Sequence, residues 1–169
     1  VNDLSAFGRH APRGLARAIL EITRKSPQTW GGARRAFFLR ALAVKILNGR
    51  PLDVESLGAQ MRLYPANNTC EKRLLFTPHY FDAAERALLA NVVREDLHFV
   101  DIGASAGGYS LFVAGLAGAR AKILAVEPNP IIFERLIYNI RQNPFATVKA
   151  LECAVADREG EITLFLDAR

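Results

Sequence analysis

From His98 onward, short apolar runs alternate with segments whose apolar residues recur at helical spacing. Strands are predicted over Phe99–Ile102 and Lys122–Val126, and helices over Tyr109–Leu116 and Pro130–Gln142. A third strand is predicted over Thr147–Val155. Strands joined by helices of this length form right-handed crossovers, so the strands run parallel. The pattern predicts an α/β fold with part of a doubly wound sheet.

The residues before this region predict helices and one hairpin. Helical spacing covers Leu15–Ile22 and Ala33–Leu47, and Asn48-Gly49 ends the second helix. Apolar and polar residues alternate within Pro51–Tyr64, and Gly58 marks a turn there. A helical region followed by a short β-hairpin is therefore expected before the sheet.

Two further elements are expected from shorter signals. Asn67-Asn68 is predicted as a loop, and Asp82 is predicted to cap a helix through about Arg94, with Glu85 in the capping-box position. Glu161–Leu166 alternates again after a turn and is predicted as an antiparallel strand. We expect three regions: basic helices at 1–50, a hairpin with a lead-in helix at 51–95, and the α/β region at 96–169.

The net charge of +5 belongs to the N-terminal third. Residues 1–60 hold ten Lys or Arg against four Asp or Glu, and the remainder is nearly neutral. A basic face attracts nucleic acid, an anionic membrane surface or a phosphorylated substrate, and it is also what a solvated helix face looks like. No basic and aromatic pattern typical of RNA readers is found, so no specific nucleic-acid partner is expected.

Composition excludes several other classes. No run of about 18 apolar residues occurs, so no transmembrane segment is expected. Cys70 and Cys153 are too few for a disulfide framework, and no Cys or His spacing fits a metal site. A reduced, cytoplasmic compartment is the expectation.

A glycine-rich turn follows the first predicted strand. The strand ends in Asp101-Ile102, and Gly103, Gly107 and Gly108 leave room for a ligand to approach the backbone. The next helix opens there, and its free N–H groups favour an anion. Glu127 ends the second strand, where a carboxylate can accept hydrogen bonds from both hydroxyls of a ribose. Ligands bind at this edge of an open parallel sheet.

Two classes of nucleotide cofactor use such an arrangement. A dinucleotide fingerprint needs G-x-G-x-x-G, but Ser105 occupies the second glycine position. Asp101 would also repel a pyrophosphate, whereas it suits a cationic ligand such as S-adenosylmethionine, which carries an ammonium and a sulfonium. The alternative is that Asp101 only braces the loop by accepting backbone N–H bonds.

Three blocks of sequence resemble the FkbM family of S-adenosylmethionine-dependent methyltransferases. They are FVDIGASAGGYSL at 99–111, AVEPNP at 125–130 followed by FERL at 133–136, and AVADREGEITL at 154–164. The resemblance covers roughly Leu74 to Leu166. The family usually has asparagine where this chain has Ser105, whose hydroxyl still offers a hydrogen-bonding group. The resemblance implies a Rossmann-like class I methyltransferase fold.

The resemblance also implies roles for particular residues. Around the methionine moiety it implies Asp101, Gly103, Ala104 and Gly107, and Ser105 in the same turn is expected to bind the cofactor. For the ribose it implies Glu127, for the adenine Pro128 and Asn129, and for the adenine edge Cys153 and Ala154. Tyr80 and Glu85, which precede the first strand, would close over the methionine end.

Members of the family typically methylate hydroxyl groups on saccharides, glycolipids or natural products. A general base would assist the acceptor hydroxyl, but the sequence does not identify one. His79 and His98 are nearby candidates, although His98 opens a strand at the end away from the expected site.

A class I methyltransferase has about seven strands, and only the first three of them are recognisable here. We therefore expect part of a longer protein, with low activity on its own, or a homo-oligomer that covers the open sheet edge. Two other functions stay open: half of a nucleotide-binding oxidoreductase, and a non-catalytic binding or scaffold module.

Overall fold

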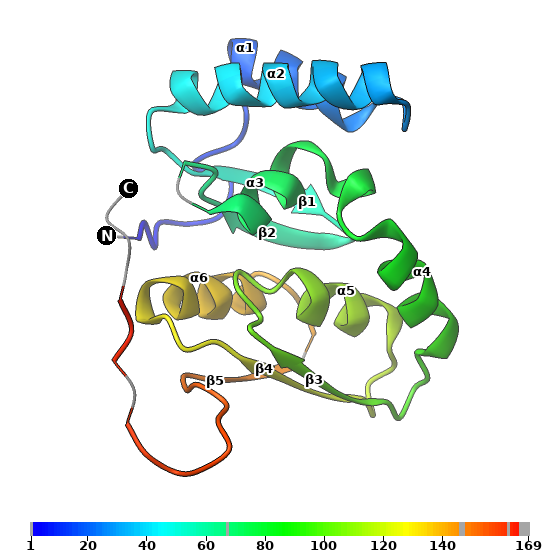
Figure 1. Cartoon of the computed structure of the whole chain (residues 1–169), viewed down its shortest axis with the longest axis vertical. Coiled ribbons are helices and arrows are strands. Elements are labelled where there is room, and N and C mark those ends of the chain that lie inside the picture. The colour runs from blue at the N-terminus through cyan, green and yellow to red at the C-terminus, as the bar shows by residue number, and fades with distance from the viewer. Residues whose placement is uncertain (1, 67, 146–147, 162, 166–169) are drawn as a thin grey trace. The chain divides into compact units, whose positions relative to one another are not determined.

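A computed structural model describes residues 2–66, 68–145, 148–161 and 163–165 (Figure 1). The chain forms two compact units. Residues 4–92 make up the helix–hairpin unit, and residues 1–3 with 93–169 make up the sheet unit. The change from one unit to the other lies just before the predicted α/β region.

The helix–hairpin unit contains the predicted helices and hairpin. Its elements are α1 (Gly14–Arg24), α2 (Trp30–Leu47), β1 (Leu52–Ser56), β2 (Ala59–Leu63), α3 (Thr69–Phe76), the 3-10 helix η1 (Pro78–Tyr80) and α4 (Ala83–Val92). Strands β1 and β2 pair antiparallel. Asn48 adopts the left-handed conformation at the end of α2, as the Asn-Gly signal predicted. The hairpin and the α1–α2 pair are thus confirmed.

Helix α3 was missed from the sequence. Its N-cap is Asn68, whose side-chain oxygen accepts a hydrogen bond from the Glu71 backbone N–H at 3.0 Å. Asn67 lies outside the described residues. The signal that was available is an Asn cap with Glu three positions later, followed by Leu74, Leu75 and Phe76, which are all fully buried.

A buried ion pair fastens the hairpin to the N-terminal segment. The Arg62 Nε donates to Asp53 Oδ1 at 2.6 Å, and each of the two side chains is only 1% exposed. The other carboxylate oxygen of Asp53 accepts hydrogen bonds from the backbone N–H groups of Gly8 and His10. The Arg62 guanidinium also donates to the carbonyls of Ser5 and Ala6. These hydrogen-bond partners of Asp53 and Arg62 all belong to the helix–hairpin unit. Buried charges are tolerated when they are paired and hydrogen-bonded in this way.

The sheet unit has the predicted β-α-β-α-β order. Its elements are β3 (His98–Ile102), α5 (Gly108–Leu116), β4 (Lys122–Val126), α6 (Pro130–Arg141) and β5 (Val148–Leu151). The strands are parallel in the order β3-β4-β5. Helices α5 and α6 lie on the same face of this sheet (Figure 1). The α/β prediction is confirmed.

The end of the sheet unit differs from the prediction. Strand β5 stops at Leu151 instead of Val155, and Thr147 lies outside the described residues. Leu151 pairs with Val126, the last residue of β4, so a longer β5 would have no neighbour on β4. Of the predicted strand at 161–166, Ile162 and Leu166 lie outside the described residues, and the others that are described are not in a strand.

The face of the sheet opposite α5 and α6 is exposed. Val100 and Ile102 on β3 and Leu151 on β5 all point to this face and are about half exposed or more. Among the described residues, β3 has a strand neighbour on one side only. Within the described residues, the sheet therefore consists of three parallel strands, with β3 and β5 at its two sides. Within the described residues, no helix is both long and apolar enough to cross a bilayer.

Breaking the buried ion pair tests what holds the helix–hairpin unit together. Asp53→Ala leaves the Arg62 charge buried without its partner and removes the acceptor for two backbone N–H groups. We expect it to lower the free energy of unfolding by about 3–5 kcal/mol, measured by chemical denaturation and far-ultraviolet circular dichroism. Glu21→Ala is the control, because its partner Arg17 is exposed and their pair contributes little. An equal loss in both variants would contradict this account.

Candidate functional site

The turn after β3 has an unusual backbone. Gly103, Ser105 and Gly107 all have positive φ angles, of 78°, 51° and 95°. The backbone N–H groups of Gly103 and Ala104 both donate to the Val126 carbonyl, at 2.8 and 2.9 Å. The turn is therefore anchored on the end of β4, at the edge of the sheet where ligands of open α/β folds bind.

The two glycines at the ends of this turn serve different purposes. A Cβ atom at Gly103 would have no atom within 4 Å, so its surroundings are open. A Cβ atom at Gly107 would lie 3.0 Å from Leu136 Cδ1, so this position is filled by the packing of α5 on α6. Open space at Gly103 fits the predicted approach of a ligand to the bare backbone, whereas the side chains of Leu136 and Leu111 leave little room at Gly107.

Asp101 accepts two hydrogen bonds from the first turn of α5. Its Oδ2 lies 3.0 Å from the Ser110 backbone nitrogen and 2.6 Å from the Ser110 hydroxyl. Burial raises the pKa of the Asp101 carboxyl; the bonds from Ser110 oppose that rise, and the charge of Glu127 adds to it. Asp101 thus braces the loop, as the alternative prediction had it. Within the described part of the chain its Oδ1 makes no hydrogen bond, so the brace does not exclude a cationic ligand.

Glu127 joins the turns that follow β3 and β4. Its Oε2 accepts from the Ser105 N–H at 2.9 Å, and its Oε1 accepts from the Asn129 N–H at 2.9 Å. The residue is buried, with 7% of its surface exposed. Each carboxylate oxygen still has a second lone pair, so the bonds to the loops leave acceptor capacity for a ligand.

Two supporting residues were not found from the sequence. Asn139 on α6 is fully buried and donates from its side chain to the Ala106 carbonyl at 3.0 Å. Ser110 is also fully buried and binds Asp101 as described above. Asn139 lies on the buried side of an amphipathic helix, so a polar residue among apolar positions of Pro130–Arg141 was the available signal.

The remaining predicted residues of the sheet unit lie at the same edge. Pro128 and Asn129 follow β4, and the Asn129 side chain caps α6 by accepting from the Ile131 N–H at 3.0 Å. Cys153 and Ala154 follow β5 and are half-buried. Glu127 N–H donates to the Leu151 carbonyl at 3.1 Å, which ties the end of β5 to the second acid.

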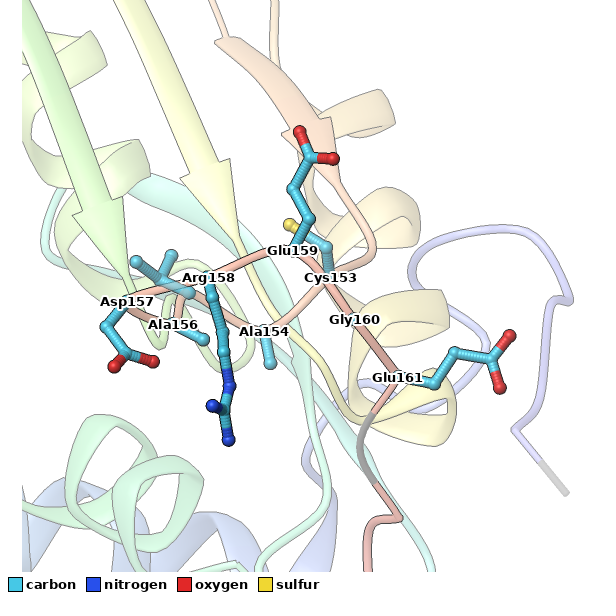
Figure 2. A pocket seen from close by; sticks show the side chains of 9 residues that line it. Cys153, Ala154, Ala156, Asp157, Arg158, Glu159, Gly160 and Glu161 are labelled. Atoms are coloured by element: carbon cyan, nitrogen blue, oxygen red, sulfur yellow. The ribbon is translucent and has the colours of Figure 1, made fainter.

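A hollow of about 910 Å³ lies along the segment after β5 (Figure 2). Residues 153–161 line it, so it takes in Cys153 and Ala154 but not the turn at 103–107. Among the described residues, its lining is one continuous stretch of chain. The hydrogen-bonded acids at the ends of β3 and β4 are therefore better evidence for a ligand site than the hollow itself.

Tyr80, Glu85 and His79 belong to the helix–hairpin unit. The Tyr80 hydroxyl donates to the Pro27 carbonyl, and the His79 Nε2 lies 3.0 Å from the Ser26 carbonyl. Glu85 is in the first turn of α4. Their predicted contributions to the cofactor site, and that of His79 as a base, stay predictions. His98 is the first residue of β3, at the end of the strand away from Asp101.

Comparison with known proteins gives one sequence relative and a matching fold. Over 91 residues, 53% of this chain, the sequence is 33% identical to the methyltransferase sdnD of Sordaria araneosa. Those residues are 32% of that protein, so the chain spans about a third of the length of the curated relative it matches. No protein-family model matches the chain.

The fold is similar to that in the crystal structure of P. horikoshii TYW2 in complex with MeSAdo. The match covers 79% of this chain and 53% of the TYW2 chain. The TM-score is 0.51 and the sequence identity is 22%. The fold of this chain is therefore that of the Rossmann-like class I methyltransferases, with helices and a hairpin before the sheet.

Substituting alanine for Gly103 and for Gly107 shows how much backbone strain and side-chain packing each contribute to stability. Each substitution forces a side chain into a left-handed conformation, which costs about 1–2 kcal/mol. Gly107→Ala also presses a methyl group against Leu136, so we expect a lower thermal unfolding midpoint for it than for Gly103→Ala. Gly160→Ala is the control, because it has open space and no positive φ. If Gly103→Ala were the more damaging change, the packing role of Gly107 would be wrong.

Proposed function

We propose that the sheet unit forms the S-adenosylmethionine-binding half of an O-methyltransferase of the FkbM type. The acceptor is a hydroxyl group on a saccharide, a glycolipid or a natural product. The observation that carries the proposal is the pair of buried or half-buried acids, Asp101 and Glu127, at the ends of adjacent parallel strands around a turn of positive φ. Similarity to part of a methyltransferase supports it.

The chemistry of these residues fits the cofactor. Asp101 is a half-buried carboxyl whose pKa is raised by burial, and a cationic ammonium beside it would favour its charged form. Glu127 keeps one lone pair on each oxygen, which suits the two hydroxyls of a ribose. Gly103 has open space where a side chain would stand, so a ligand can reach the backbone there.

The residues of this chain would bind and orient the cofactor. When bound, S-adenosylmethionine supplies a methyl group activated by its sulfonium. Asp101 and Glu127 would fix the two ends of the ligand, because Ser110 and the loop N–H groups already hold both carboxylates in place. Positioning of this kind supplies much of the acceleration of a transfer between two bound molecules.

The other functional expectations are part of the same proposal. A reduced, cytoplasmic compartment belongs to the proposal, because Cys70 and Cys153 are too few for a disulfide framework. The exposed face and free side of β3 agree with a covering by further strands or by a second copy of the chain.

The pH dependence of ligand affinity tests the role of Asp101. A neutral carboxyl cannot pair with the ammonium of S-adenosylhomocysteine, so affinity should fall as the pH drops through the raised pKa of Asp101. This loss should occur above the pH at which an ordinary aspartate titrates. In the ligand-free protein the trend is opposite: stability falls as the pH rises through the same range, because the folded state holds this proton more tightly.

The variants Asp101→Asn and Glu127→Gln measure separately how much each end of the ligand contributes to binding. In equilibrium dialysis, Asp101→Asn should bind weakly at every pH and lose the pH-dependent step. Glu127→Gln should lose about 2–3 kcal/mol of affinity but keep that step. A wild-type affinity that does not change over the acidic range, with Asp101→Asn indistinguishable from it, would refute the role given to Asp101.

A further inference from the structure

Helix α2 exposes an unusual number of large apolar side chains. Trp30 is 77% exposed and Phe38 is 73% exposed. Phe37, Leu42 and Ile46 are also exposed on the same helix. The residues of α2 that pack inward are Gly32, Ala36, Ala43 and Leu47, which are mostly small. The helix thus buries mostly small residues and exposes its larger apolar groups, and most monomers do not expose such a surface without a binding role.

The same stretch of chain is basic and has no acid. Between Ser26 and Leu52 there are four arginines and one lysine, and no Asp or Glu occurs. Arg34 lies with its guanidinium carbon 4.7 Å from the centre of the Trp30 ring, and Arg40 lies 4.6 Å from that of Phe37. Basic and apolar side chains are therefore interspersed on the exposed side of α2. We call this surface the α2 face, and its residues are Trp30, Arg34, Phe37, Phe38, Leu42, Lys45 and Ile46.

A basic pocket adjoins the C-terminal end of the α2 face. It has a volume of about 340 Å³, and its lining includes Arg9, Arg13 and Arg50 beside the apolar Leu15 and Ile46. Among the residues that the structure describes, no Asp or Glu lines it. Ile46 belongs to both the pocket and the α2 face. Asp53, which holds the N–H groups of Gly8 and His10, fixes the segment that carries Arg9.

We propose that the α2 face docks on a membrane surface that contains anionic phospholipid, with a lipid phosphate in the basic pocket. Exposed Trp and Phe side chains prefer the headgroup region of a bilayer, and arginine and lysine beside them bind its phosphates. This inference does not depend on the proposed methyltransferase activity. Of the partners that the sequence allowed for the basic N-terminal third, the proposal selects an anionic membrane surface.

A nucleic acid fits the α2 face less well. Bases stack on free aromatic faces, but Arg34 and Arg40 already lie over the rings of Trp30 and Phe37. Exposed aliphatic side chains also do not contribute to binding phosphates or bases. They are Leu42 and Ile46 on α2, and Leu15 and Ile22 on α1. A bilayer gives such groups an apolar environment.

The single tryptophan of the chain gives a direct measurement. Trp30 is the only tryptophan among the 169 residues, and it lies on the α2 face. The full chain is titrated with vesicles of phosphatidylcholine alone and of phosphatidylcholine mixed with phosphatidylserine. We expect cosedimentation and a blue shift of the Trp30 emission with the mixed vesicles, and weaker binding at high salt.

Surface variants test both parts of the α2 face. Arg34→Gln and Lys45→Gln should each lower the partition to the mixed vesicles by about fivefold, the effect of one charge near an anionic surface. Phe38→Ser together with Leu42→Ser should remove the blue shift. Leu88→Ser on α4 and Arg141→Gln on α6 are matched exposed controls and should bind as the unchanged chain does.

Three results would overturn the proposal. The first is no binding to the mixed vesicles, or binding without the blue shift. The second is binding to a single-stranded RNA oligonucleotide in place of vesicles, which would assign the α2 face to nucleic acid. The third is self-association of the chain that shifts the Trp30 emission in the absence of lipid, which would assign it to a second copy.

Discussion

The candidate site depends on two carboxylates that hold the loops at one edge of a parallel sheet. Asp101 binds the first turn of α5 through Ser110, and Glu127 binds the turns after both β3 and β4. These bonds fix the backbone of the turn in a conformation of positive φ at Gly103, Ser105 and Gly107. Because a buried acid costs free energy unless it is hydrogen-bonded, the loops and the acids stabilise one another.

In the proposed function, the same acids set which ligand the site prefers. A carboxyl with a raised pKa, next to open space over a bare backbone, favours a cationic ligand over a pyrophosphate. Their structural role does not compete with binding, since each acid retains acceptor capacity. The helix–hairpin unit contributes a different surface, the α2 face, whose basic and apolar residues are separate from this chemistry.

Much of the sheet unit could be predicted because its signals are local. Lys122–Val126 has the predicted bounds, since a buried strand ends at an acid and a proline there. Gly103 and Glu127 directly follow adjacent strands, because those strands end where the sequence pattern predicted. What failed depends on neighbours distant in the sequence: the end of β5 is set by the end of β4, and Asn139 is explained by the Ala106 carbonyl that it binds. The outward direction of Phe37 and Phe38 was also missed, because small residues on α2 form its inward side.

The most direct test of the central claim is calorimetry of the whole chain with two nucleotides that differ in charge near the turn. S-adenosylhomocysteine has an ammonium for Asp101 and a ribose for Glu127, whereas NAD brings a pyrophosphate to the same place. The account predicts measurable heat and a saturating isotherm with S-adenosylhomocysteine, and none with NAD at equal concentration. Tighter binding of NAD would contradict it, because a carboxylate beside the turn would then not select for positive charge.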